Sequence, residues 1–483
     1  MKAATNFIDI ESPLDKKITV KPISWTMIHI HAYQGPCRYG KGYTLTSEYD
    51  EEVEKKALAR FTQLIDENID KTRFNVLEPV ALNWNEDFVI RDDVWDAVLK
   101  DYGNTDIFLI NGVRLPQRFI TELAKRTDKP ILVMPTEKSL AKCGHVDTSA
   151  YLYALGYKNI YPCMDIHDVA GTMNALHLKE ALRNTRVLFP QKGPSPSYGC
   201  LSSYISLDRI TERLGVSFSC IQAEEVFEAI DALTPAERKM AEELTEELIE
   251  QSEGLHMEKT YMPRDYWFYL AIRKMLQEYG CNAFTIPCFE ICATRELDKR
   301  KFTFCLAKTL LREERIPSAC AGDVGSVISN LIMMAIAGAA PYMGNTMVWK
   351  GDENLCRIHH DSPTRFMKGY DKPRMPYQIA PFTLDDWGTT IRYNFDADKG
   401  ASVTLINISP DMTKLAIVSG TVDGCDDFVT AECKLAMRFK VKDIRDFFNC
   451  QKYVGSHFSM VYGDWKHELL KAAEVLGMEA VCV

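Results

Sequence analysis

Residues 106–135 read DIFLINGVRLPQRFITELAKRTDKPILVMP, and they give the clearest indication of the architecture of the first half of the chain. Two short apolar runs, DIFLIN (106–111) and PILVMP (130–135), stand on either side of an amphipathic helical stretch. Short apolar runs that alternate with helical patterns are typical of βαβ units and parallel sheets. The same alternation continues with TRVLFP (185–190), VSFSCI (216–221) and AFTIPC (283–288).

The pattern restarts near residue 183 and changes again near residue 352. TRVLFP follows a helix predicted over 166–183 and leads into the Gly/Pro/Ser loop QKGPSPSYG, as the start of a new domain would. Later strands follow one another without helices between them. We therefore predict an α/β protein with two N-terminal α/β domains that contain parallel sheets, followed by a C-terminal β-rich, barrel-like domain. The predicted ranges are 1–182, 183–352 and 353–483.

One apolar segment, VISNLIMMAIAGAAPYM (327–343), is 17 residues long and almost uncharged. This length is at the lower edge of what spans a bilayer, and the segment contains Ser329 and Asn330 and approaches its end at Pro341. We predict a helix buried on all sides within the protein.

The composition excludes several classes of partner. The 483 residues carry a net charge of −10 with a pI near 5.6, which argues against nucleic acid or an anionic membrane as the main partner, because phosphate binding needs a concentrated basic surface. The polar N-terminus lacks the apolar core of a signal peptide, so we expect a cytoplasmic protein. The 15 cysteines contain no CxxC pair, and we interpret most of them as small buried hydrophobic residues in a reducing compartment.

The segment GPCRYGKGY (35–43) has the frame of a phosphate-binding loop. Gly42 stands where Ser or Thr should bind magnesium, and the next helix begins only near Ser47. The lysine and the helix N-terminus would not converge on a phosphate, so we do not predict a nucleotide site. The sequence also lacks GxGxxG and GxSxG motifs.

Two carboxylates in the middle domain are candidates for chemistry. Glu290 follows the apolar run AFTIPCF, and ligands of parallel α/β sheets bind outside the carboxyl ends of strands. The alternative is an exposed loop glutamate. Asp323 precedes the long apolar helix, where aspartate commonly acts as an N-cap. The two roles of Asp323 are compatible, because a carboxylate at a helix start can also face a metal.

Histidines in two C-terminal motifs are the other candidates. LCRIHHDSP contains His359 and His360, which are either structural or able to act as ligands or proton carriers. GSHFSMVYGD (455–464) places His457 in a small-residue turn that opens into an alternating, strand-like run.

Taken in order, CFE, ACAGDV with its apolar helix, MGNTMVW, IHHDSP, ASVTLINIS and GSHFSMVYGD resemble the middle and C-terminal domains of the L-fucose isomerase/L-arabinose isomerase superfamily. The resemblance covers about residues 283–483. The residues before it match only as α/β domains of suitable size.

The resemblance implies a divalent manganese ion held by Glu290, Asp323 and His457 against the hydroxyls of an open-chain sugar. It also implies that Glu290 and Asp323 act as acid/base groups, and that His359, Asn345, Trp349 and Arg38 bind substrate. Two carboxylate oxygens and one imidazole suit Mn²⁺ and leave positions open for substrate oxygens. Such a cation polarises a carbonyl and stabilises an enediolate while a proton moves between C2 and C1.

The resemblance therefore implies a Mn²⁺-dependent ketol isomerase for a pentose, a 6-deoxyhexose or a modified sugar. It further implies a homohexamer in which the loop around His31, Tyr33 and Arg38 reaches the substrate of a neighbouring subunit. The chain departs from the family at ACAGD, where Ala321 replaces a glutamate that many members carry. This leaves two alternatives open: another enediolate reaction, such as epimerisation or carbon–carbon cleavage, or a non-catalytic sugar-binding protein on the same scaffold.

Overall fold

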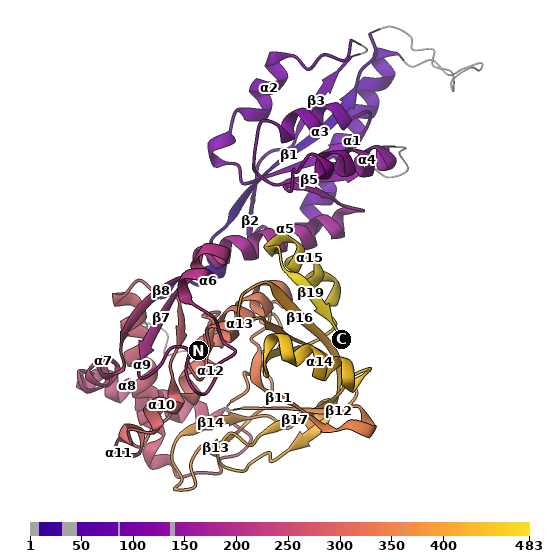
Figure 1. Ribbon diagram of the computed structural model, residues 1–483. Helices are drawn as coiled ribbons and strands as arrows, with labels where there is room; N and C mark the ends of the chain where they lie inside the picture. The colour runs from indigo at the N-terminus through magenta and orange to yellow at the C-terminus, as the bar shows by residue number, and fades with distance from the viewer. Residues whose placement is uncertain (1–8, 31–45, 86, 136–140, 361) are drawn as a thin grey trace. The chain divides into compact units, whose positions relative to one another are not determined.

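The computed structural model describes residues 9–30, 46–85, 87–135, 141–360 and 362–483 (Figure 1). The chain forms two compact units. Unit 2 comprises Lys16–Met173, and unit 1 comprises Met1–Asp15 together with Asn174–Val483.

Unit 2 is a parallel sheet with helices, as the apolar runs predict. Its strands lie in the order β2-β1-β4-β5-β6, and β3 also pairs with β1. All of these pairings are parallel. The core contains a stacked pair, Trp25 and Phe119, with ring centroids 4.1 Å apart. The elements are β1 (Ile18–Met27), α1 (Ser47–Asn68), β2 (Phe74–Val76), β3 (Val80–Trp84), α2 (Asp92–Leu99), β4 (Ile107–Gly112), α3 (Gln117–Ala124), β5 (Ile131–Pro135), α4 (Ala141–Ala154), β6 (Ile160–Pro162) and the start of α5 (Ile166–Arg183).

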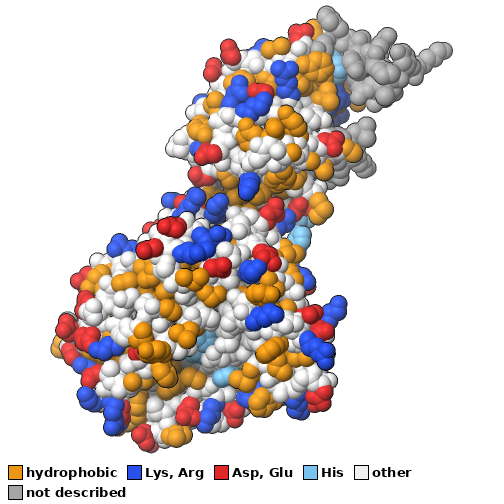
Figure 2. All heavy atoms as spheres, viewed as in Figure 1, with side chains coloured by type: hydrophobic (Ala, Val, Ile, Leu, Met, Phe, Trp, Pro, Cys, Tyr) orange, Lys and Arg blue, Asp and Glu red, His pale blue; other side chains and the backbone are white. Residues whose placement is uncertain are grey.

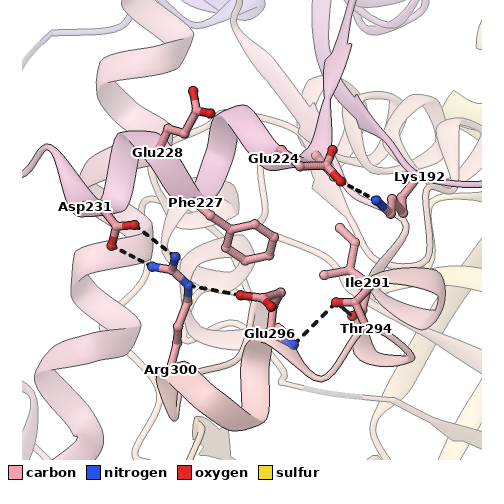
Figure 3. Close-up of a pocket in the computed structure, with 10 residues that line it drawn as sticks. Lys192, Glu224, Phe227, Glu228, Asp231, Ile291, Thr294, Glu296 and Arg300 are labelled. Carbon is pink, nitrogen blue, oxygen red and sulfur yellow. Dashed lines mark hydrogen bonds and ion pairs between the residues drawn. The ribbon is translucent and has the colours of Figure 1, made fainter.

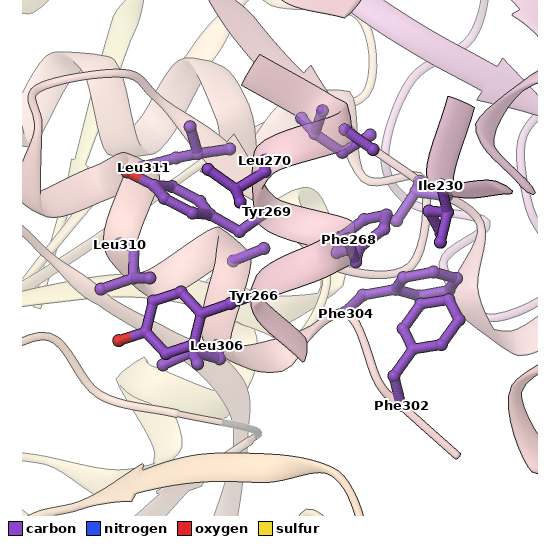
Figure 4. Close-up of a cluster of buried hydrophobic side chains, with 14 of the residues drawn as sticks. Ile230, Tyr266, Phe268, Tyr269, Leu270, Phe302, Phe304, Leu306, Leu310 and Leu311 are labelled. Atoms are coloured by element: carbon purple, nitrogen blue, oxygen red, sulfur yellow. The ribbon is translucent and has the colours of Figure 1, made fainter. Parts of the chain in front are cut away.

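Unit 1 begins with a second parallel sheet, in the order β10-β9-β7-β8. Helices α9 and α12 bury a large aromatic cluster beside it (Figure 4). Phe268 lies 4.8 Å from Phe304 and 5.7 Å from Phe302 between ring centroids. The elements are β7 (Arg186–Gln191), α6 (Leu207–Leu214), β8 (Ser217–Gln222), α7 (Ala223–Asp231), α8 (Pro235–Glu250), α9 (Met262–Glu278), β9 (Ala283–Thr285), α10 (Cys288–Cys292), α11 (Glu296–Arg300), α12 (Cys305–Glu313), β10 (Ser318–Ala319) and α13 (Val324–Ala337).

The remainder of unit 1 is a closed antiparallel barrel of six strands, in the order β15-β18-β11-β12-β17-β16, with β16 pairing back to β15. Strand β19 adds to β16 in parallel. A separate hairpin pairs β13 with β14. The elements are β11 (Tyr342–Lys350), β12 (Leu355–His359), β13 (Gln378–Pro381), β14 (Thr389–Arg392), β15 (Ser402–Ile408), β16 (Lys414–Asp426), β17 (Ala436–Lys440), α14 (Ile444–Val454), β18 (His457–Tyr462), α15 (Lys466–Leu476) and β19 (Glu479–Cys482).

The predicted fold class is confirmed: parallel α/β sheets precede an antiparallel barrel. The domain limits stay predictions, and two observations bear on where limits fall. The compact units divide at Met173, inside α5, and the first barrel strand, β11, starts at Tyr342. Short 3₁₀ turns complete the chain at Pro13–Asp15, Tyr102–Asn104, Lys259–Tyr261, Gly351–Glu353 and Phe395–Asp398.

The apolar segment is a buried helix only in part: α13 (Val324–Ala337) has buried residues from Val324 to Ile336. The end of the segment is not helical, because the helix stops at Gly338 and β11 begins at Tyr342. Helix α13 lies against β18, β15 and β10. Within the described residues, no helix is both long and apolar enough to cross a bilayer.

Candidate metal centre

Three loops of unit 1 follow neighbouring strands of the β10-β9-β7-β8 sheet and leave it at the same edge. In a parallel sheet the carboxyl ends of the strands meet at one edge, where ligands bind. The loop after β7 leads to Cys200, the segment after β9 leads to Glu290, and the segment after β10 leads to Asp323. Strand β18 of the barrel adds His457 to this edge.

Asp323 and His457 form the centre of the site. The Nδ1 atom of His457 lies 2.7 Å from Oδ2 of Asp323, although 134 residues separate them in sequence. Only 2 % of Asp323 and 4 % of His457 are exposed. Burial of a carboxylate is costly unless partners surround it, so the contact is strongly specified by the fold.

Asp323 is also the N-cap of α13, as the sequence predicts. Its Oδ1 accepts from the backbone N–H of Ser326 at 3.0 Å, and Oδ2 accepts from the Ser326 hydroxyl at 2.6 Å. Burial acts to raise the pKa of Asp323, but His457 and these bonds outweigh it and hold the pKa well below its usual range. Asp323 is therefore an ionised carboxylate at neutral pH, which is the form that binds a cation.

Cys200 is the third member of the group, and the sequence reading did not single it out. Its Sγ lies 3.2 Å from Oδ2 of Asp323 and 3.2 Å from Nδ1 of His457. Burial and the neighbouring Asp323 raise the pKa of its thiol. Among the described residues, Cys200, Asp323 and His457 are the group of histidine, cysteine and carboxylate side chains whose ligand atoms all lie within 4.8 Å of one another. The available signal was position, since Cys200 follows a parallel strand at its carboxyl end.

Glu290 lies outside this group in the part of the chain that the structure describes, so the predicted trio is not brought together as three adjacent ligands. Glu290 stands on α10, and the Ser197 hydroxyl donates to its carboxylate at 2.7 and 2.8 Å. The backbone N–H of Tyr198 donates to the same carboxylate at 2.7 Å. These donors come from the same loop as Cys200, so Ser197–Cys200 joins Glu290 to the Asp323–His457 pair.

Ala321 and Gly322, between the last β10 residue and Asp323, both have left-handed backbone, with φ of 59° and 64°. Alanine seldom adopts this conformation. A Cβ on Gly199 would lie 3.6 Å from the Cβ of Ala321, so the Ser197–Cys200 loop passes close over Ala321. Ala321 is thus at the site, where the family resemblance expects a glutamate.

Two further predicted residues, Asn345 and His359, are neighbours on the barrel and lie beside His457. Asn345 of β11 pairs with His359 of β12 on one side and with His457 of β18 on the other. The neighbouring His360 ring lies 5.5 Å from the His457 ring between centroids. Burial lowers the pKa of His359, and His360 and Arg357 lower it further. Asn345 therefore stands between two of the predicted histidines.

The other two predicted substrate-binding residues are Trp349 and Arg38. Trp349 is 46 % exposed, and the Arg357 guanidinium lies over its ring at 4.2 Å. It is four residues beyond Asn345 on a strand that rises roughly 3.3 Å per residue, so it lies about 13 Å further along. Arg38, with His31 and Tyr33, falls outside the described residues.

A cavity of about 270 Å³ adjoins His457. Its wall is mainly apolar and includes five cysteines. Figure 2 shows histidine side chains in a hollow flanked by apolar side chains on this unit. The lining residues are Gly199, Cys288, Phe289, Cys292, Leu297, Thr303, Phe304, Cys305, Lys308, Cys320, Ala321, Asn345, His360, Phe382, Cys433 and His457.

A second pocket of about 350 Å³ lies between α7, α10 and α11 (Figure 3). Arg300 donates to both oxygens of Asp231, at 2.6 and 2.9 Å, and Lys192 pairs with Glu224. Its cations are already paired, so we assign it no function.

The chain matches no protein-family model, and no curated protein matches it.

Proposed function

We propose that this chain is a divalent-metal-dependent ketol isomerase that interconverts an aldose and a ketose. The single observation that carries the proposal is the buried Asp323–His457 contact of 2.7 Å at the carboxyl edge of a parallel sheet. An anionic oxygen, an imidazole nitrogen and a sulfur from three distant segments meet there. The sequence resemblance to the L-fucose isomerase/L-arabinose isomerase superfamily supplies the reaction.

The donor set fits a divalent metal. Asp323 is ionised and His457 presents Nδ1 to the same point, so together they would hold the ion. The resemblance points to Mn²⁺, which favours oxygen and nitrogen ligands, whereas the sulfur of Cys200 is a donor that zinc prefers. When bound, a divalent cation would polarise a sugar carbonyl and stabilise negative charge on its oxygen.

The surrounding residues have roles that follow from their contacts. Ser197 and Tyr198 fix the orientation of the Glu290 carboxylate, which we assign as the group that moves the proton between C1 and C2. His359 and Asn345, which neighbour His457 across the barrel strands, are assigned to substrate hydroxyls. The apolar wall of the cavity limits the access of water to the reacting carbons.

A second candidate is a different enediolate reaction, either epimerisation or carbon–carbon cleavage, at the same centre. Ala321 favours it, because this residue lines the cavity and has no acid/base group where many family members carry glutamate. Without this proton carrier, the enediolate has one group fewer to deliver the proton to C1 that forms the ketose.

Incubation with a panel of aldoses and a divalent metal in D₂O, followed by NMR at C1 and C2, separates the candidates. Ketose formation supports isomerisation, and deuterium at C2 without ketose supports epimerisation. Shorter carbon chains would support cleavage. No exchange and no turnover with either Mn²⁺ or Zn²⁺ would contradict both candidates.

The variant His457→Ala should abolish turnover and lower metal affinity while the protein stays folded, because one donor of a buried group is lost. His467→Ala is the matched control, since His467 is on α15, outside the Cys200–Asp323–His457 group. Unchanged metal affinity in His457→Ala would contradict the assignment.

A further inference from the structure

Two cysteines that the proposed reaction does not use lie in contact beside the site. The Sγ atoms of Cys288 and Cys320 are 3.3 Å apart. Cys288 is the first residue of α10, and Cys320 directly follows β10. Both line the cavity that adjoins His457.

A buried lysine accompanies this pair. Lys308 is 1 % exposed, and its ammonium donates to the Sγ of Cys320 at 2.5 Å. The hydrogen bond with Cys288 and burial raise the pKa of the Cys320 thiol, whereas Lys308 acts to lower it. The pKa of Cys320 stays raised overall, and the contact with Lys308 holds its sulfur in place beside Cys288.

The two thiols also differ in access. Cys320 is 4 % exposed, whereas Cys288 is partly exposed. A small reagent therefore meets Cys288 first, and Cys320 is positioned behind it as the resolving thiol.

We propose that Cys288 and Cys320 are an oxidative modification site, at which a low-molecular-weight disulfide converts them reversibly to an intramolecular disulfide. The Cys288 thiolate attacks the reagent RSSR, forms a Cys288–SR mixed disulfide and releases one RS⁻. The Cys320 sulfur then loses its proton to solvent, attacks Sγ of Cys288 and releases the second RS⁻. Two protein thiols are oxidised by two electrons, and one RSSR is reduced to two thiols.

The positions of the two cysteines favour this cross-link, because the sulfur atoms need to move little and the bond would join two segments of the site. A disulfide bond is about 2 Å long, so the two sulfur atoms need to approach by roughly 1 Å from their present 3.3 Å. Cys288 precedes Glu290 by two residues, and Cys320 precedes Asp323 by three. The disulfide would tie together the two segments that carry these carboxylates, and it would remove both thiols from the cavity wall.

The test uses the full-length protein with 2-hydroxyethyl disulfide as the probe, followed by alkylation, digestion and mass spectrometry. We expect a Cys288–Cys320 cross-link that disappears on addition of a phosphine reductant. Cys320→Ser should instead accumulate the Cys288 mixed disulfide, and Cys288→Ser should leave Cys320 as a free thiol.

Cys292→Ser is the matched control. Cys292 is at the end of the same short helix, is exposed and lines the same cavity, so its loss should leave the cross-link yield unchanged. Wild-type protein that carries the mixed disulfide on Cys288 beside a free Cys320, or that pairs either cysteine elsewhere, would overturn the proposal. This readout needs no variant, so it holds even where a serine substitution impairs folding.

The effect on the site rests on the proposed function. Cross-linked protein should show at least a tenfold change in metal affinity or turnover, restored by reduction and absent in Cys288→Ser. A cross-link without this change would leave the modification site standing and contradict its regulatory role, whereas absence of turnover in the reduced protein would contradict the proposed function alone.

Discussion

Each of the two units contains a completely buried aspartate that faces Nδ1 of a histidine. In unit 2, Oδ2 of Asp50 lies 2.5 Å from Nδ1 of His29, and Asp50 also pairs with Arg114. In unit 1, Oδ2 of Asp323 lies 2.7 Å from Nδ1 of His457. Within the described residues, Asp323 has no lysine or arginine partner. Besides His457 and Ser326, its carboxylate is in contact with the thiol of Cys200.

The difference lies in which group compensates the buried charge. Arg114 is permanently charged, so Asp50 is neutralised from within the chain. Asp323 has only a histidine and hydrogen-bond donors, which leaves its charge available to an external cation. The aspartate charge is thus compensated within the chain in unit 2, whereas in unit 1 the proposed function gives that role to a metal. This comparison predicts opposite outcomes for matched substitutions.

Asp50→Asn should have the largest effect on stability. The substitution leaves Arg114 and His29 beside a neutral amide, and breaking a buried ion pair costs about 3–5 kcal/mol. Urea unfolding should show this loss, with metal affinity unchanged. A variant as stable as the wild type would show that Arg114 reaches solvent instead and that the comparison fails in unit 2.

Asp323→Asn should instead act mainly on metal affinity. It removes an anionic ligand, and because loss of an outer hydrogen-bond partner already costs 10–100-fold, we expect at least about a 100-fold loss. Calorimetric titration with Mn²⁺ and Zn²⁺ measures it, and Asp50→Asn is the control. Equal metal affinity in Asp323→Asn and the wild type would contradict the assignment of the site.

Cys200→Ser should change the choice of metal. Replacement of sulfur by oxygen should weaken Zn²⁺ binding by about 10-fold or more and leave Mn²⁺ binding nearly unchanged, because Mn²⁺ favours oxygen donors. Co²⁺ added to the wild type should give a sulfur-to-metal absorption band that Cys200→Ser lacks. A wild-type protein with no such band would show that Cys200 is a hydrogen-bond partner and not a ligand.

Much of the fold could be predicted from the sequence because parallel strands are buried on both faces and appear as apolar runs. DIFLIN and PILVMP became β4 and β5 within a residue of their predicted limits. AFTIPC was predicted less well. Strand β9 ends at Thr285, and Cys288 already begins α10, because Pro287 has no N–H to continue a strand ladder.

The candidate site could be predicted only in part. Asp323 and His457 were chosen from the order of motifs, and the structure places them in contact; their role as metal ligands stays a prediction. For Cys200 the sequence offers only its position in the loop after β7, because the fold alone brings Asp323 and His457 to it. Glu290 was chosen from the sequence, but the orientation of its carboxylate could not be predicted, because it depends on Ser197, 93 residues away.

His145 should give the smallest effect, a pH dependence that belongs to unit 2. Burial lowers its pKa to about 4, and neither ring nitrogen has a hydrogen-bond partner among the described residues. In the unfolded chain its pKa is about 6.5, so between these values the unfolded state binds more protons, and stability falls as the pH falls. From pH 7 to 5.5 the wild type should lose about 1 kcal/mol of unfolding free energy through His145. His145→Leu has no titrating group at this position, so its urea unfolding curves should change less over this range, and an equal change in both proteins would show that the acid sensitivity arises elsewhere.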